Sequence, residues 1–310
     1  MPFFHALEGI AVLLFIVALG WLFARQGLVS EDLRHLLPKF ITCVALPPFL
    51  MLNIIRSLDR GGLVHMLYGG LIPLGTICAV FALAWVTGRI VGVEKKHAGL
   101  FCVCVSSSNT IFVGVPFNLA VFGPDSLPYV MLYYAASTTF LWTVGIQAIA
   151  ADGGSRHESM ARILARIFSP PMLGFLAGIA ILLSGFEPPR LVMEIADQLG
   201  SMTTPLALLY VGTTLQGMEL RDISPNRDIV LALTGRLALS PLLMLAVVRF
   251  LSLPELMGKV FVIQSALPVL MQAAILSGHF RTDPRYAALT VSLSTVLSAL
   301  TLPLWVLALS

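Results

Sequence analysis

Charged residues are scarce in this chain of 310 residues, because Asp, Glu, Lys and Arg together make up only 11% of it. The hydrophobic share is 57% and the mean hydropathy is +0.91. Soluble domains carry about a quarter charged residues, so this composition excludes an ordinary soluble protein and indicates several membrane-spanning segments. No polar stretch is long enough to form a soluble domain of useful size.

The sequence also lacks the motifs of several catalytic and nucleotide-binding classes. It has no His-Glu-x-x-His, no Gly-x-Ser-x-Gly, no P-loop and no pair of mid-span aspartates. The acid, base or metal of an intramembrane enzyme is therefore missing, and we do not expect ATP to drive transport directly. We expect no enzymatic activity and no resident cofactor. The modest net charge of +3 does not favour nucleic acid as a partner.

Cysteines and the amino terminus give two further exclusions. The four cysteines lie in apolar runs without clustered His or acidic residues, which argues against both disulfides and a metal site: Cys43, Cys78, Cys102 and Cys104. No Lys or Arg precedes the first apolar run. We therefore interpret that run as a retained helix and not as a cleaved signal peptide.

Apolar runs of membrane-spanning length fill the chain. A helix needs about 20 apolar residues to cross roughly 30 Å of hydrocarbon, and joins rich in Gly, Pro, Asp and Ser separate the runs. The ten expected spans are residues 7–25, 34–55, 63–89, 99–121, 127–149, 166–184, 191–217, 228–250, 258–279 and 285–309. We predict an all-α polytopic membrane protein with ten transmembrane helices.

The two halves of the chain match at a nearly constant offset. Shifted by 158 to 160 positions, Gly20 falls on Gly178, Pro47 on Pro205, Arg89 on Arg249 and Phe101 on Phe261, with Asn109 close to Pro268. Because five spans is an odd number, two such repeats must have opposite orientations in the membrane. We expect a first five-helix repeat at 1–149, a short cytoplasmic linker at 150–165 and an inverted second repeat at 166–310.

Basic residues in the joins predict the orientation. With the amino terminus outside, twelve fall in inner joins and five in outer ones; the inner set is Arg25, Arg34, Arg89, Lys95, Lys96, Arg156, Arg162, Arg166, Arg221, Arg227, Arg281 and Arg285, and the outer set is Arg56, Arg60, Arg190, Arg249 and Lys259. We expect both termini on the periplasmic side of a bacterial inner membrane. The charged inner turn 94–97 is interpreted as a topological anchor.

Small polar residues interrupt the fourth span. Residues 106–110 read Ser-Ser-Ser-Asn-Thr in the middle of an apolar run, and Gly114 and Pro116 follow. The bilayer core holds no water for freed backbone groups, so such a patch persists only inside protein or beside a cavity. We expect Gly114 and Pro116 to shape a helix break. The substrate-binding candidates from this span are Ser107, Ser108, Asn109 and Thr110.

A matching break is expected in the ninth span. Pro268 removes a backbone donor and clashes with the preceding turn, which should leave carbonyls near Gln264 and Ser265 unpaired. Two broken helices in opposed repeats would bring half-helix ends together, and helix N-termini favour a carboxylate. Candidates from this span are Gln264, Ser265 and Gln272. The alternative is that these polar residues only hold helices together and the prolines are harmless kinks.

The fourth-span stretch Asn109-Thr110-Ile111-Phe112-Val113-Gly114-Val115-Pro116 resembles the Asn-Thr-x-x-x-Gly-x-Pro motif of the auxin efflux carrier family, which includes bacterial malonate and other organic-acid carriers. Weaker similarities extend over the whole chain. The resemblance implies that spans four and nine cross at the substrate site. It also implies an elevator mechanism, in which spans three to five and eight to ten move against a scaffold of spans one, two, six and seven.

Other polar residues within the spans are secondary candidates: Asn53, Tyr133, Ser137, Asp197 and Arg236. An ionisable group inside the membrane is costly and indicates function by default, so Arg236 could attract an anion. Snorkelling of Arg236 to the inner interface, or a carboxylate partner, is slightly favoured instead. Asp197 could couple a proton or cation to transport, although a solvated helix end is the favoured interpretation.

The leading hypothesis is a secondary carrier of a small organic anion, a mono- or dicarboxylate such as malonate, with a coupling proton or sodium ion left open. One alternative is a sodium-coupled symporter of the bile acid type, which shares the ten-span layout. Alternatives of another class are an intramembrane enzyme, a ligand sensor or a channel. The expected partners are the anion and the lipid bilayer. A homodimer could form through Gly20 with Ala24 or Gly174 with Gly178, which could equally pack inside the monomer.

Overall fold

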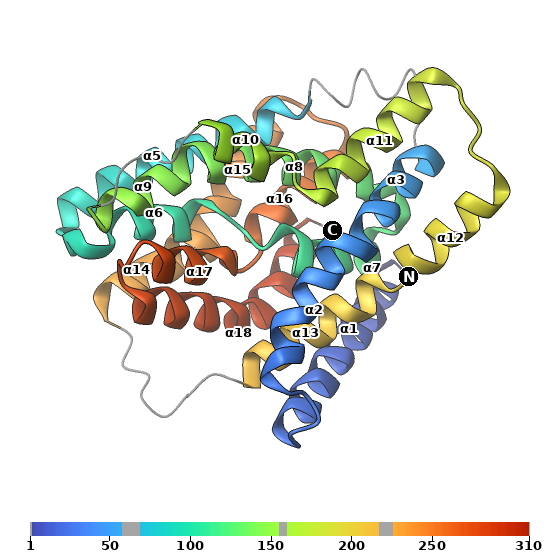
Figure 1. The fold of residues 1–310 in the computed structure, drawn as a ribbon. Helices are drawn as coiled ribbons and strands as arrows, with labels where there is room; N and C mark the ends of the chain where they lie inside the picture. The colour runs from blue at the N-terminus through green and yellow to red at the C-terminus, as the bar shows by residue number, and fades with distance from the viewer. Residues whose placement is uncertain (1, 58–68, 155–159, 217–225, 310) are drawn as a thin grey trace. The chain divides into compact units, whose positions relative to one another are not determined.

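The helices of the chain divide into two compact units (Figure 1). The computed structural model describes residues 2–57, 69–154, 160–216 and 226–309 and contains no β-strand within them. Unit 1 comprises Met1–Gly69, Ile111–Leu132 and Phe168–Met218, and unit 2 comprises Gly70–Thr110, Tyr133–Ile167 and Glu219–Ser310. The prediction of an all-α protein is confirmed for the described residues.

Unit 1 contains the helices of the first, second, sixth and seventh expected spans and the second half of the fourth. Its elements are α1 (Pro2–Arg25), α2 (Glu31–Phe40), η1 (Ile41–Ala45), α3 (Leu46–Ser57), α7 (Val115–Phe122), η4 (Pro124–Ser126), α11 (Pro170–Ser184), α12 (Arg190–Ser201) and α13 (Thr203–Gln216). Two further elements cross the boundary between the units in sequence, η3 (Thr110–Gly114) and α8 (Leu127–Phe140).

Glycines let the helices of unit 1 approach closely. A Cβ atom on Gly20 of α1 would lie 2.3 Å from the Leu209 carbonyl oxygen of α13, and one on Gly174 of α11 would lie 2.3 Å from the Pro47 carbonyl oxygen of α3. Only a hydrogen fits in such contacts. These small residues therefore pack inside the chain, and the homodimer stays a prediction that they do not support.

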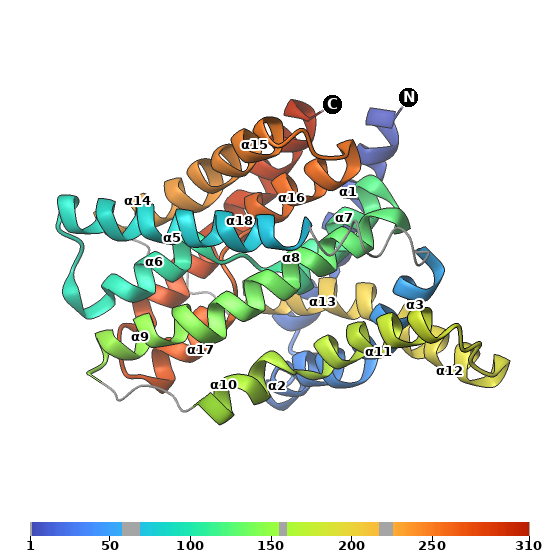
Figure 2. The ribbon, with the colours of Figure 1, turned by 90° about the horizontal axis from the view of Figure 1, so that it is seen from above.

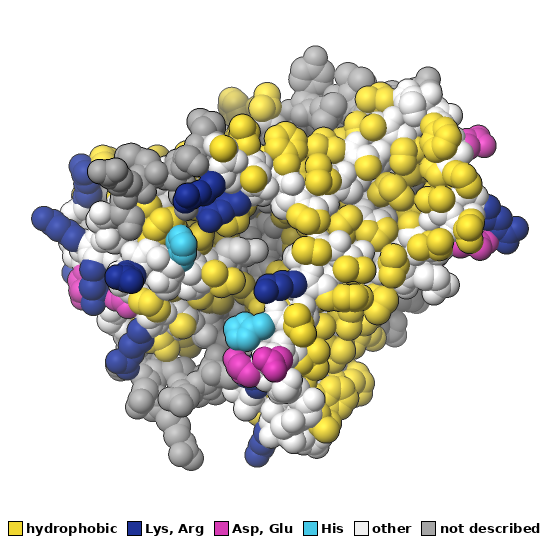
Figure 3. Space-filling model, in the orientation of Figure 1, with side chains coloured by type: hydrophobic (Ala, Val, Ile, Leu, Met, Phe, Trp, Pro, Cys, Tyr) yellow, Lys and Arg dark blue, Asp and Glu magenta, His cyan; other side chains and the backbone are white. Residues whose placement is uncertain are grey.

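Hydrophobic side chains cover much of unit 1 on the face drawn in Figure 3. Phe15 of α1, Leu173 of α11 and Leu191 of α12 are among the large apolar side chains that are more than half exposed. Exposed apolar surface of this extent marks an interaction with lipid or protein. Together with the composition, it fits helices that face a bilayer.

Unit 2 has two buried helices at its centre, α6 (Ala98–Ser106) and α16 (Glu255–Ala266). Residues 100–106 and 260–266 are buried without exception, as expected of helices that are enclosed on all sides. The surrounding elements are α5 (Leu71–Val91), η2 (Lys95–His97), η5 (Leu141–Gly145), α9 (Ile146–Asp152), α10 (Met160–Ile167), α14 (Arg227–Thr234), η7 (Gly235–Leu239), α15 (Ser240–Phe250), α17 (Gln272–His279) and α18 (Pro284–Ala308). α5 packs on α6, and α15 and α18 pack on α16 (Figure 2).

Helices fall in each of the ten expected spans, but only some are long and apolar enough to cross a membrane unbroken. Among the described residues these are Glu31–Arg56, Leu71–Val91, Arg227–Phe250 and Pro284–Ala308, with a fifth if the bent pair Ala161–Ile167 and Pro170–Ser184 counts as one span. The structure thus supports a multi-pass membrane protein. Ten spans in inverted repeats stay a prediction. Residues 63–68 of the third expected span and 155–159 of the linker lie outside the described residues.

Wide π-helical turns precede three of the prolines. The turns η1, η3 and η7 each end two residues before a proline, at Pro47, Pro116 and Pro241. Proline lacks the N–H of an α-helical bond and its ring clashes with the preceding turn, and a π turn accommodates both effects within a continuous helix. Gly114 and Pro116 consequently lie in helical turns, and the chain leaves the helix earlier than we expected, at residues 107–109.

Candidate substrate-binding site

The two helix breaks of unit 2 lie side by side. After α6 and α16 end, the chain leaves the helical path in both places. The Asn109 N–H donates to the Pro268 carbonyl at 2.9 Å, and the Leu270 N–H donates to the Ser107 carbonyl at 3.3 Å. Backbone groups freed inside a membrane must find partners within the protein. Here each break supplies partners to the other.

Arg236 of η7 contacts both half-helices from a third element. Its side chain is fully buried. The guanidinium donates to the Val105 carbonyl in the last turn of α6 at 3.1 Å, to the Ser265 carbonyl in the last turn of α16, and to the Ser240 hydroxyl at 2.9 Å. Last-turn carbonyls lack a helical partner and carry the negative end of the helix dipole, so one cation satisfies the ends of two helices.

These contacts overturn the interpretation that we slightly favoured for Arg236. A snorkelling side chain would reach the membrane surface, but Arg236 has no exposed area. A paired side chain would meet a carboxylate, but its hydrogen-bond acceptors within the described residues are two carbonyls and a hydroxyl, all neutral. A functional role for Arg236, the other interpretation of an ionisable residue within a span, stays a prediction.

Several buried polar atoms at the paired breaks and on α8 have no hydrogen-bond partner among the described residues. In the described part of the chain, no protein group bonds to Ser107 Oγ, Ser108 Oγ, Tyr133 Oη, Arg236 Nε or either amide atom of Gln264. The Tyr133 hydroxyl lies near Ser108 and Arg236. All five side chains are at most 3% exposed. Buried polar groups are nearly always paired in native proteins, so this cluster indicates a place for a polar ligand or for water.

The other fourth- and ninth-span candidates also belong to unit 2. Asn109, Thr110 and Ser265 are buried, and Gln272 is half-buried at the first position of α17. The Ser265 hydroxyl donates to the Val262 carbonyl at 2.7 Å, so its bonding capacity is partly used within its own helix. The sequence-predicted set therefore gathers in one unit.

Of the secondary candidates, Tyr133 and Ser137 are buried in unit 2, whereas Asn53 and Asp197 belong to unit 1. The Asn53 amide donates to the Phe49 carbonyl at 2.7 Å, a bond within its own helix. Asp197 is about half exposed and forms an ion pair with Arg56 at 2.6 Å. This position fits the solvated helix end that we favoured for Asp197.

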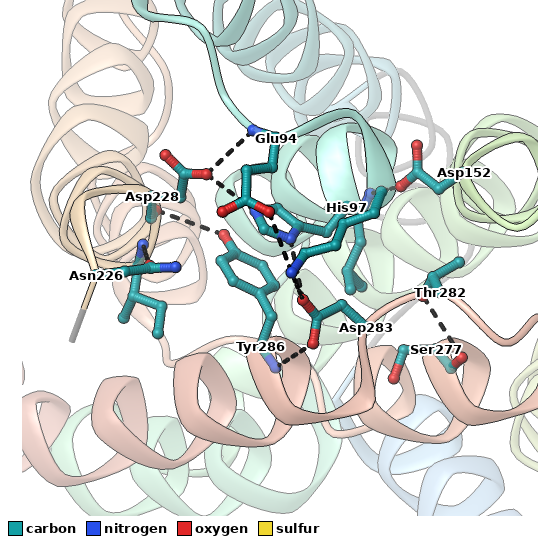
Figure 4. Close-up of polar contacts among 12 residues, drawn as sticks. Glu94, His97, Asp152, Asn226, Asp228, Ser277, Thr282, Asp283 and Tyr286 are labelled. Carbon is teal, nitrogen blue, oxygen red and sulfur yellow. Dashed lines mark hydrogen bonds and ion pairs between the residues drawn. The ribbon is translucent and has the colours of Figure 1, made fainter. Parts of the chain in front are cut away.

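Sequence reasoning missed a second polar cluster, at the N-terminal ends of α6, α14 and α18 (Figure 4). His97 is fully buried, with Nε2 2.9 Å from the Asp228 carboxylate and Nδ1 3.2 Å from the Asp283 carboxylate. Its ring stacks on Tyr286 with 4.1 Å between ring centroids. The turn 94–97 is therefore more than a topological anchor, because His97 ties three helix starts together.

Within this cluster, Asp283 and Lys96 shift each other's pKa toward the charged form. Burial by itself would raise the pKa of the Asp283 carboxyl, but hydrogen bonds from the Tyr286 N–H, Lys96 and His97 outweigh it and lower the pKa overall. The Glu94 and Asp283 carboxylates raise the pKa of the Lys96 ammonium. Asp283 also caps α18 by accepting from the Tyr286 N–H at 3.0 Å. The sequence feature that indicates this cap is the pair Asp283-Pro284 at the start of α18.

Comparison with known proteins identifies the class of this molecule. The family described as "membrane transport protein" matches residues 5–306, nearly the whole chain. The chain belongs to this family. The resemblance to the auxin efflux carriers, which rested on the fourth-span motif, is thereby confirmed at the level of the family.

Two relatives of this transporter come from archaea and match it from end to end. An "uncharacterized transporter" of Methanothermobacter thermautotrophicus is 27% identical over 98% of this chain and 99% of its own length. An "uncharacterized transporter" of Methanocaldococcus jannaschii is 21% identical over 96% of this chain and 97% of its own length. Both descriptions support membrane transport, and neither names a substrate.

Proposed function

We propose that this membrane transporter is a secondary carrier of a small organic anion, a mono- or dicarboxylate such as malonate. The observation that carries the proposal is the buried Arg236 guanidinium at the paired helix breaks, together with buried hydroxyl and amide groups of the same unit that find no partner in the described part of the chain. Ser107, Ser108, Tyr133 and Gln264 would donate hydrogen bonds to a carboxylate.

The size of the electrostatic terms supports an anion as the ligand. A helix end contributes about 0.3–1 kcal/mol to a nearby cation at a surface, and up to ~2 kcal/mol when partly buried. Burying an ion costs several kcal/mol even after the protein relaxes. The two helix ends that Arg236 touches therefore offset only part of the cost. A bound carboxylate would supply the missing counter-charge.

The position of Arg236 also bears on the coupling ion. In carriers with discontinuous helices, the C-terminal ends of half-helices coordinate a sodium ion or proton. Here the guanidinium already bonds to the last-turn carbonyls of Val105 and Ser265. Transport by this chain should accordingly need no sodium ion at the breaks, which disfavours a sodium-coupled symporter of the bile acid type.

The proposed mechanism is an elevator in a membrane protein of ten spans and two inverted repeats. Supporting it, the helices of spans one, two, six and seven belong to unit 1, and the paired breaks belong to unit 2. The helices of spans one, two, six and seven would be the scaffold, and the moving block would be unit 2 together with the part of spans four and five that belongs to unit 1. The excess of basic residues in alternate joins supports outer termini in an inner membrane.

Gln264→Leu tests the site assignment, because both amide atoms of Gln264 are buried and have no partner within the described ranges. Replacing such a group by an apolar one of similar shape should leave stability unchanged or raise it. Uptake of labelled malonate into proteoliposomes should nevertheless fall at least tenfold, as should uptake by Asn109→Ala.

Thr290→Val is the matched control, since Thr290 is also fully buried but bonds to the Tyr286 carbonyl at 2.7 Å. It should keep wild-type uptake. If Gln264→Leu takes up every tested carboxylate at the wild-type rate, the assignment is wrong.

A further inference from the structure

A pocket of about 560 Å³ opens in unit 2 beside the start of α6, and none of the candidate substrate-binding residues lines it. Its walls come from the second half of α5, from η2, from the first turns of α6 and from the end of α9. Pockets of roughly 300–1,000 Å³ are typical of small-molecule sites. The volume suits a polar head group together with part of an acyl chain.

Two basic side chains line this pocket, Arg89 and Lys95. The Arg89 guanidinium carbon lies 3.7 Å from the centroid of the Trp85 ring, which holds the guanidinium fork over the indole. This fork matches the oxygens of a phosphate. Figure 3 shows Lys and Arg side chains gathered over this end of unit 2.

The acidic residue of the pocket does not oppose an anion. Asp152 accepts hydrogen bonds from the backbone N–H groups of Gly99 at 2.9 Å and Leu100 at 2.8 Å, one on each carboxylate oxygen. Its charge is therefore directed at the positive N-terminal end of α6. The net attraction of the pocket for an anion comes from Arg89 and Lys95.

The remaining walls favour an amphiphile over a free anion. Phe81, Val93 and Cys102 line the pocket. The helix α5 also carries the exposed apolar side chains of Leu83 and Ile90. A small dicarboxylate would gain nothing from these surfaces, whereas an acyl chain would bury apolar area against them. Trp85 is of the type that lies at the membrane–water boundary.

We propose that this pocket binds an anionic phospholipid, with its phosphate between Arg89 and Lys95 and its acyl chains along α5. Basic pockets between transmembrane helices on the cytoplasmic side are known to hold acidic lipid head groups, and Arg89 and Lys95 both fall in the joins that the charge distribution places inside. The site is separate from the carrier site, so it stands whether or not the anion proposal holds.

Native mass spectrometry of the purified full-length protein in detergent, titrated with phosphatidylglycerol or phosphatidylcholine, tests the proposal. We expect wild-type protein to retain phosphatidylglycerol in preference to phosphatidylcholine. The double variant Arg89→Gln/Lys95→Gln should bind phosphatidylglycerol about 30-fold more weakly, on the order of fivefold for each basic side chain.

Arg25→Gln/Lys39→Gln is the matched control. Arg25 also lies over a tryptophan, 5.1 Å from the centroid of the Trp21 ring. Arg25 is expected on the inner side, and Lys39 lies near the same inner join in the sequence. Both residues are exposed, but neither lines the pocket. This variant should bind as wild type does. Equal weakening in both double variants would overturn the proposal, because the effect would then be general surface charge.

Two further experiments test the place of the site and the identity of its ligand separately. Ala151→Trp fills the pocket from an exposed position without removing a charge, and it should weaken binding at least fivefold; wild-type binding by this variant would place the lipid elsewhere. Glycerol phosphate at millimolar concentration should not displace phosphatidylglycerol. Displacement would mean that the pocket takes a free phosphate and that the lipid proposal is wrong.

Discussion

At the scale of single residues, the molecule depends on the shape of the Arg236 side chain. A guanidinium carries several N–H donors in one plane and can bond to separate acceptors at once. Arg236 uses them on carbonyls of two helices and on the Ser240 hydroxyl. A lysine ammonium is a compact point charge on a flexible stem and does not match this arrangement.

Arg236→Lys should therefore destabilise the protein although it keeps the charge. Leaving one buried carbonyl unsatisfied costs about 1–3 kcal/mol, so we expect a fall of several degrees in Tm and at least tenfold weaker binding of dicarboxylates. Arg249→Lys at the exposed end of α15 is the control and should change neither. Wild-type Tm and affinity in Arg236→Lys would show that the charge alone matters.

Asp283 allows a second residue-scale prediction, about pH. Because its folded pKa is lowered, the ionised carboxylate stabilises the fold above the ordinary Asp pKa of about 4, and this contribution is lost as the pH falls through the lower folded value. Asp283→Asn keeps the ability to cap α18 but loses the charge. Its Tm should lie below wild type at pH 7, with a free-energy loss of about 1 kcal/mol.

The difference in Tm between Asp283→Asn and wild type should shrink as the pH is lowered below about 4, because wild type then also loses the charge. Thermal unfolding followed by circular dichroism at several pH values measures this. Asp125→Asn, at an exposed position of η4, should match wild type throughout. A constant difference at all pH values would contradict the role given to the Asp283 charge.

At the scale of helices and their packing, unit 1 depends on glycines at close contacts. Gly174→Ala would place a Cβ atom 2.3 Å from the Pro47 carbonyl oxygen, and backbone cannot give way locally. α11 and α3 must then separate, and we expect a loss of about 2 kcal/mol or more, since overpacking typically costs 1–3 kcal/mol. Thermal unfolding of the purified variant measures it.

Gly75→Ala is the matched control for that change. Gly75 also lies in a helix, but a Cβ atom there meets no atom of the described residues within 4 Å. Alanine is favoured over glycine inside a helix by about 0.5–1 kcal/mol, so Tm should hold or rise. Similar losses in Gly174→Ala and Gly75→Ala would mean that the α3–α11 contact is not the cause.

Elements were also the level at which the sequence predicted most. Pro268 and the polar run 106–110 predicted that both helices break, because a missing N–H and small polar side chains are local features. The first break was expected at Gly114 and Pro116 but lies at residues 107–109, since the π turn η3 accommodates Pro116 within a helix. Arg236 and His97 were misjudged for another reason: each has a partner more than 130 positions away in sequence, and no local pattern reports such contacts.

At the scale of the whole molecule, the family match, the apolar composition and the helices of spanning length agree on a membrane transporter. The relatives are of the same length but leave the substrate open. The chemistry in unit 2 of this chain combines a buried cation, which has no acidic partner among the described residues, with buried polar atoms that also lack a partner there. The proposed anion carrier rests on that combination.

Thermal stabilisation of the purified protein by dicarboxylates, measured in sodium and in choline buffers, tests the central claim most directly. A ligand at 100 times its Kd stabilises the folded state by about 2.7 kcal/mol. We predict that a dicarboxylate of malonate size raises Tm by several degrees equally in both buffers, that Arg236→Met abolishes the shift, and that Arg249→Met keeps it. A shift that requires sodium, or that persists in Arg236→Met, would contradict the account.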